Sequence, residues 1–350
     1  MSGRKKRAAK GKEAWWAFVH LVLAGIVYLA FAVYLYSPHF RRIRDLDNLV
    51  VVVLPLAAFG CYVLSRRWVS LFTGSLAAGA LYGFGPYVLG LLEYHVAASL
   101  LAALIPWLFL PSAFAFKRRF TWLRWPCAIL PFAAIFSFFE VCGRIRFFAV
   151  PKQARLHADG LIGLLAPLVA AKLGSVGVLI GFYHVPIAAF AIGLAMSVAA
   201  KRYAVLTVPI AGLVLGLSRP VLGVSPVMWF TIPAVFFAVA AGVGVQGISI
   251  AGARDKKWLL LAASLMAALA IFALLLATKY FQVFLGLAFG YAKLFLEAGK
   301  IYSLGAVVIG IIFVITRLKF RASILRQGLL VAVLGLDIFI GARFIIDKML

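Results

Sequence analysis

The sequence predicts an all-α fold, a polytopic bundle of helices that cross a lipid bilayer. Of its 350 residues, 65% are hydrophobic and only 13% are charged, and the mean hydropathy is +1.08. Soluble domains are about 45–50% apolar and about 25% charged, so this chain has too few polar groups to cover a water-soluble surface. The apolar residues also recur in long runs separated by short basic clusters, which is typical of membrane-spanning helices.

Eleven apolar runs approach the length needed to cross about 30 Å of hydrocarbon at about 1.5 Å per residue. They are residues 15–36, 48–64, 69–92, 96–116, 125–142, 174–200, 203–217, 226–250, 258–278, 301–316 and 324–344. Tryptophans stand at the edges of several runs, as in an interfacial aromatic belt: Trp15, Trp16, Trp68, Trp122, Trp125 and Trp258.

The first run follows a basic N-terminus that reads Arg-Lys-Lys-Arg at residues 4–7. The run itself is longer than the core of a signal peptide, about 7–15 residues, and no small-residue cleavage site follows it. We therefore expect an uncleaved first helix with its basic end in the cytoplasm and a location in a plasma membrane, specifically a bacterial inner membrane. Residues 1–13 are then a cytoplasmic basic tail, and residues 14–350 form a single transmembrane bundle.

The third run contains the segment Gly83-Phe84-Gly85-Pro86. Proline removes a backbone donor and the two glycines loosen the helix, so the segment predicts a kink or a break. Broken helices often line the sites of transporters.

Two further segments, 161–173 and 281–299, leave the number of crossings at eleven or, alternatively, twelve. Either segment could be a short interfacial or re-entrant helix, and the second is amphipathic. Eleven crossings place 21 of the 35 Lys and Arg residues in the cytoplasm. If both segments cross, 18 Lys and Arg residues lie in the cytoplasm and 17 outside, which fits the positive-inside rule poorly. If only 281–299 crosses, the numbers are again 21 inside and 14 outside. We favour eleven, because Arg317, Lys319, Arg321 and Arg326 form a dense basic cluster.

The net charge of +25 does not indicate nucleic-acid binding, because the basic residues are grouped in the short loops between apolar runs. The segment 242–247 matches the dinucleotide motif G-x-G-x-x-G, but it lies inside an apolar run with no preceding strand. We predict that its glycines serve helix packing. No cofactor and no metal site follows from the sequence.

Acidic, histidine and arginine side chains gather in the loops expected outside the cytoplasm. Paired carboxylates with nearby imidazoles suit a metal ion or a general base. The candidates for such a catalytic site are Asp45, Asp47, Glu93, His95, His157 and Asp159. Arginine suits phosphate or carboxylate groups, and the candidates for anion binding are Arg41, Arg42, Arg144, Arg146 and Arg155.

Asp45 and Asp47 in the first outer loop resemble the site style of polyprenyl-phosphate-dependent glycosyltransferases, which carry acidic residues there. The resemblance implies a membrane-embedded transferase with a lipid-phosphate donor. The alternative is structural: both carboxylates cap the second helix near Asn48 and offset the neighbouring arginines.

Ionisable residues inside the apolar segments are costly unless they are paired, protonated or facing a cavity. Asp337, Lys293 and Glu297 are the candidates. Asp337 has no obvious partner nearby in the sequence and is the best single candidate for a proton-coupling or ion site, although a structural carboxylate paired across helices is equally compatible.

Three functions are therefore open. The leading hypothesis is a transporter-like protein that handles an anionic solute or a lipid headgroup. The lipid-phosphate transferase is the second, and a non-catalytic subunit of an envelope complex is the third. Whether the chain is an enzyme stays open, and the bilayer is the one partner that all three share.

Overall fold

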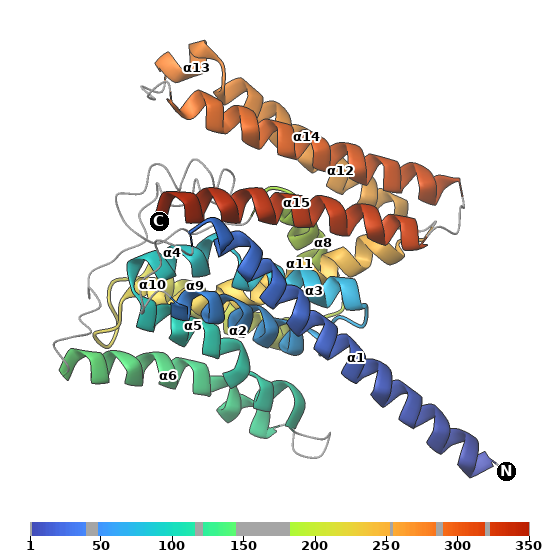
Figure 1. Cartoon of the computed structure of the whole chain (residues 1–350), viewed down its shortest axis with the longest axis vertical. Coiled ribbons are helices and arrows are strands. Elements are labelled where there is room, and N and C mark those ends of the chain that lie inside the picture. The colour runs from blue at the N-terminus through green and yellow to red at the C-terminus, as the bar shows by residue number, and fades with distance from the viewer. Residues whose placement is uncertain are drawn as a thin grey trace.

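A computed structural model describes residues 2–39, 48–115, 122–144, 183–252, 255–284, 290–318 and 323–349 of the chain. In these ranges the chain is helical apart from short connections and one isolated bridge between Val221 and Val224. The all-α prediction is therefore confirmed (Figure 1).

The helices, in chain order, are α1 (Ser2–Tyr36), η1 (Ser37–His39), α2 (Asn48–Ser65), α3 (Phe72–Gly83), α4 (Pro86–Tyr94), α5 (Val96–Leu108), η2 (Pro111–Ala115), α6 (Arg124–Arg144), α8 (Pro186–Ala199), α9 (Tyr203–Leu217), α10 (Pro226–Trp229), α11 (Thr231–Ile250), α12 (Lys256–Leu276), α13 (Lys279–Phe284), α14 (Gly290–Arg317) and α15 (Ser323–Met349).

Among the described residues, eight helical segments are long and apolar enough to cross a membrane. Three shorter apolar helices accompany them, at Val51–Ser65, Pro186–Ala199 and Val205–Leu217. Many large apolar side chains on the outside of the bundle are exposed, including those of Leu261 on α12 and Ile129 on α6. A lipid bilayer covers such side chains, so the architecture is that of a multi-pass integral membrane protein.

The core of the bundle lies around α2, α3, α4 and α11, and α1, α5, α8, α9 and α15 pack against these helices. In Figure 1, α6 forms one edge, and α12 and α14 lie side by side at the opposite edge. Glycines allow the closest approaches. A Cβ atom on Gly242 would lie 2.7 Å from the carbonyl oxygen of Gly74 on α3, and one on Gly244 would overlap the carbonyl oxygen of Ala189 on α8. The glycines of segment 242–247 therefore serve helix packing, as predicted.

The two ends of the bundle are each held together by polar contacts. At one end, Gln246 near the end of α11 accepts hydrogen bonds from the backbone N–H groups of Ser70 and Leu71, at 2.7 and 2.9 Å. At the other end, His39 Nε2 lies 2.8 Å from Asp347 Oδ1, so the end of α1 meets the end of α15. The first and last helices therefore run in the same direction, and the chain termini lie at opposite ends (Figure 1).

The predicted break in the third run is present, and the segment 281–299 has other bounds than expected. The third run is divided into α3 and α4, as the segment Gly83–Pro86 predicts: Pro86 begins α4, and Gly85 before it has an extended backbone. The amphipathic segment 281–299 is not one separate helix, because α13 ends at Phe284 and α14 runs from Gly290 through to Arg317. No proline follows Gly290 in this stretch, so nothing divides its polar first turns from the apolar turns that follow.

Candidate functional site

Asp337 is a buried carboxylate near the middle of α15, about 20 Å from either helix end at about 1.5 Å per residue. Its side chain is 1% exposed. A carboxylate at this depth is stable only with partners that replace its hydration, because burial of an unpaired charge costs several kcal/mol, on the order of 3 or more. The partners of Asp337 therefore define the site.

Those partners come from the start of α8. One carboxylate oxygen, Oδ1, lies 2.9 Å from His184 Nδ1, and the other, Oδ2, accepts a hydrogen bond from the backbone N–H of Val185 at 2.6 Å. Pro186 occupies the first turn of α8, where its missing N–H costs nothing. Asp337 thus caps α8 from another helix, and the partial positive charge at the N-terminus of α8 stabilises the carboxylate.

The second ring nitrogen of His184 is the remaining polar atom of the pair. With Asp337 ionised, Nδ1 of His184 is the donor, because an ionised carboxylate only accepts hydrogen bonds. His184 Nε2 is buried and has no hydrogen-bond partner among the described residues. The ring of Tyr302 on α14 lies perpendicular to the imidazole, with 5.0 Å between the ring centroids. Nε2 of a neutral His184 therefore carries an unengaged lone pair in the interior of the bundle.

The break between α3 and α4 lies directly against this pair. The hydroxyl of Tyr183, the residue before His184, donates a hydrogen bond to the carbonyl oxygen of Phe84 in the break. That carbonyl has no partner within α3, because the helix has ended, and Tyr183 supplies one. Gly341, one turn after Asp337 on α15, leaves the space that the ring of Tyr183 fills, since a Cβ atom there would overlap the ring.

A further interruption, between α10 and α11, adjoins the break between α3 and α4. α10 ends at Trp229 and α11 begins at Thr231, and Tyr87 in the first turn of α4 bonds to both sides of this joint. Its hydroxyl lies 2.9 Å from the carbonyl oxygen of Val227 and 2.6 Å from Thr231 Oγ1. Interrupted backbone in a membrane protein is tolerated where protein groups satisfy it, and it often surrounds a binding site.

Known proteins give no further guide to this site. No family model, curated protein or solved structure matches the chain. Function therefore has to be argued from the geometry alone.

Most of the residues predicted for an outer site lie outside the described residues. This applies to the acidic and histidine candidates Asp45, Asp47, His157 and Asp159 and to the arginines Arg41, Arg42, Arg146 and Arg155. Glu93 is in the last turn of α4 and Arg144 ends α6, and only their backbone is described. In the part of the chain that is described, no three histidine, cysteine or acidic side chains form a metal-binding group.

The remaining candidates do not join the Asp337 pair. His95 caps α5, because its Nδ1 accepts a hydrogen bond from the N–H of Ala98 at 3.3 Å, and partial burial lowers the pKa of its imidazole. Lys293 and Glu297 lie in the first turns of α14, where Glu297 forms an exposed ion pair with Lys300 at 2.9 Å.

Sequence reasoning identified Asp337 but missed His184. The sequence shows no obvious partner for Asp337 nearby, whereas the structure supplies an imidazole and a backbone N–H from a distant segment. One signal was present: His184 stands in an apolar run two residues before Pro186, and proline at that spacing marks a helix start. The partial positive charge at a helix start favours a carboxylate, so a histidine just before a buried helix start is a candidate partner for an acidic residue on another helix.

Proposed function

We propose that this protein is a proton-coupled membrane transporter in which Asp337 and His184 form the proton-binding pair. The observation that supports it is a buried histidine whose Nδ1 is held by a carboxylate and whose Nε2 is unengaged among the described residues. A carboxylate in this position fixes the imidazole tautomer and stabilises the imidazolium when Nε2 accepts a proton. The pair then changes from one net negative charge to none.

The position of the pair also favours transport. Coupled transporters bind their ions near the middle of the bilayer, where helices are interrupted and half-helix ends are available. The α3–α4 break and the start of α8 meet at the pair through Tyr183, and both α4 and α8 begin there. A rigid, purely structural carboxylate would not require two helices to begin at the same place.

We propose an anionic substrate, either a solute or a lipid headgroup. The partial positive charge at the start of α4 favours an anion, and the chain has a net charge of +25. Protonation of the pair removes a negative charge that would repel the substrate, so proton binding and anion binding reinforce each other. The outer arginines, including Arg144 and Arg146, are the proposed first contacts of the anion.

The proposed topology has eleven crossings. Chain termini at opposite ends of the bundle require an odd number, which favours eleven over twelve. The three shorter apolar helices supply the crossings beyond the eight long ones. With the basic residues 4–7 in the cytoplasm, the C-terminus is outside, and a bacterial inner membrane is the proposed location.

Liposomes with a trapped pH dye test the proposal. Purified protein is reconstituted, and a gradient of inorganic phosphate, sulfate, a monocarboxylate or a dicarboxylate is imposed. We expect one of these anions to drive proton movement in the wild type, and we expect Asp337→Asn and His184→Gln to abolish it.

Asp347→Asn is the matched control, because Asp347 also pairs with a histidine but lies at the exposed end of α15. It should retain coupled flux. Proton movement that is unchanged in Asp337→Asn would show that the pair is not the coupling site. Folded wild-type protein that moves no proton with any of the four anions would contradict the proposed transport of small anions.

A further inference from the structure

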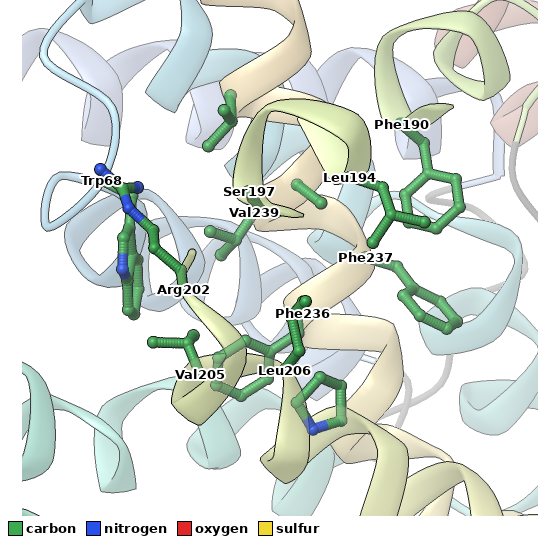
Figure 2. A pocket seen from close by; sticks show the side chains of 13 residues that line it. Trp68, Phe190, Leu194, Ser197, Arg202, Val205, Leu206, Phe236, Phe237 and Val239 are labelled. Carbon is green, nitrogen blue, oxygen red and sulfur yellow. The ribbon is translucent and has the colours of Figure 1, made fainter. Parts of the chain in front are cut away.

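A second feature lies on the outside of the bundle, away from the Asp337 pair. A groove runs between α8 and α9, and α11 forms its floor (Figure 2). The empty space between its lining residues is about 520 Å³, which includes space open to the surroundings. Apolar side chains line most of it, with Phe190 and Leu194 on one wall and Leu206 on the other. Its one neutral hydroxyl, that of Ser197, already donates to the carbonyl oxygen of Gly193 at 2.8 Å.

One end of the groove is basic. Arg202, in the loop between α8 and α9, reaches along the groove towards Trp68 (Figure 2). The side chain of Arg202 is exposed and has no hydrogen bond or ion pair within the described part of the chain. Lys201 precedes Arg202 and Arg67 precedes Trp68, so two further basic residues adjoin the residues that line this end.

The neighbouring Arg66 is not free in this way. Its guanidinium donates to the carbonyl oxygen of Ser70 at 2.7 Å, which closes its own loop. Gln246 fixes that loop to α11 by accepting from the same Ser70. The loop that holds Trp68 is thus anchored, and Arg202 lines the groove beside it with no side-chain bond to a described residue.

We propose that this groove binds an anionic phospholipid. One acyl chain lies between α8 and α9, and the phosphate contacts Arg202, with Lys201 and Arg67 nearby. The apolar lining provides no hydrogen bonds for a polar solute, which would lose its hydration there without compensation. A hydrocarbon chain has no such desolvation cost. The cationic end complements a phosphate, which guanidinium groups bind through paired hydrogen bonds. Trp68 lies where chain and headgroup meet, as interfacial tryptophans do.

The proposal is independent of the transport proposal, because neither Asp337 nor His184 contributes to the groove. The lipid is a bound component of the fold that braces α8 against α9. Since α8 begins two residues after His184, a lipid seated here stabilises the helix that follows one member of the proton-binding pair.

Native mass spectrometry of the detergent-solubilised full chain tests it, with dioleoyl phosphatidylglycerol and dioleoyl phosphatidylcholine added in equal amounts. We expect phosphatidylglycerol to bind preferentially to the wild type. Arg202→Gln should reduce that preference about fivefold, because one basic residue near an anionic surface contributes about 1 kcal/mol to binding. Leu206→Trp fills the groove and should reduce binding of both lipids. Arg219→Gln, an exposed arginine after the other end of α9, should bind as the wild type does.

Brominated lipids give a second readout, because bromine quenches the fluorescence of a nearby indole. The difference in quenching between the wild type and Trp68→Phe isolates the contribution of Trp68. Brominated phosphatidylglycerol should quench the fluorescence of Trp68 more than brominated phosphatidylcholine does. Equal binding of both lipids, or an unchanged preference in Arg202→Gln, would overturn the proposal. An equal loss of preference in Arg219→Gln would also overturn it, because the effect would then be one of overall charge.

Discussion

Two substitutions of Asp337 separate its charge from its hydrogen bonds. Asp337→Ala removes the acceptor of both His184 Nδ1–H and the Val185 N–H, which lie 2.9 and 2.6 Å from the carboxylate. Both donors are then buried without a partner. Asp337→Asn keeps one oxygen to accept from Val185, and its amide donates to His184, which changes tautomer to accept.

The expected costs follow from these partners. A buried donor without an acceptor costs about 1–3 kcal/mol, so two of them cost about 2–6 kcal/mol. Interhelical hydrogen bonds in membrane proteins average about 0.6 kcal/mol, which favours the lower part of that range. We therefore expect Asp337→Ala to lower the free energy of unfolding by about 2–3 kcal/mol. Asp337→Asn should cost less, about 1–2 kcal/mol, through the Nε2–H that the new tautomer leaves buried without a described partner and the lost interaction with the start of α8.

Reversible unfolding in mixed micelles measures both values, and His184→Ala together with the double variant completes a double-mutant cycle. The coupling energy between the two positions should be about 1–3 kcal/mol. Costs for Asp337→Ala and His184→Ala that simply add would refute the reasoning, because residues that share a buried hydrogen bond cannot be energetically independent. Equal costs for the Ala and Asn variants would show that hydrogen bonding at Asp337 contributes nothing.

Three further predictions concern the helices around the pair. Gly244→Val should destabilise the protein by about 1–3 kcal/mol, because its side chain would overlap Ala189 on α8. Gly310→Ala is the control, because a Cβ atom at Gly310 on α14 meets open space. Thermal unfolding should show a loss of stability in the first variant and none in the second. Gln246→Leu should cost about 1–2 kcal/mol in the same assay, because the N–H groups of Ser70 and Leu71 lose their shared acceptor. Burial lowers the pKa of His95 in the folded protein, so the unfolded chain binds the proton more readily, and stability is full above about pH 6.5 and falls as the pH drops through that value. His95→Asn keeps a helix cap without a titrating group and should remove this part of the pH dependence; an unchanged pH profile would contradict the assignment.

The sequence predicted the fold class and most helices because long apolar runs leave few alternatives in a membrane. The break at Gly83–Pro86 was also predictable, since proline and glycine act locally. The extent of α14 was not. Lys293 and Glu297 suggested a separate amphipathic segment, but charged side chains do not end a helix, and α14 runs through them.

The candidate site was half predicted. Asp337 was evident because a carboxylate in an apolar helix requires compensation. Its partner was not evident, because 152 residues separate Asp337 from Val185, and only the tertiary fold brings the residues before α8 against α15. Residues three or four apart lie on the same face of a helix, but sequence spacing does not predict contacts between different helices. The outer acidic and arginine candidates mostly lie outside the described residues and remain predictions.

The central claim is that the Asp337–His184 pair exchanges a proton with water. ¹⁵N NMR of histidine-labelled protein in bilayers tests it most directly, with His184→Gln used to assign the signal among the five histidines. Spectra recorded over a range from about pH 9 to about pH 5 should show His184 both as a neutral ring protonated at Nδ1 and as an imidazolium. In Asp337→Asn the imidazolium signal should be absent. A His184 signal that stays the same across the whole window would contradict the account and identify the pair as a fixed structural contact.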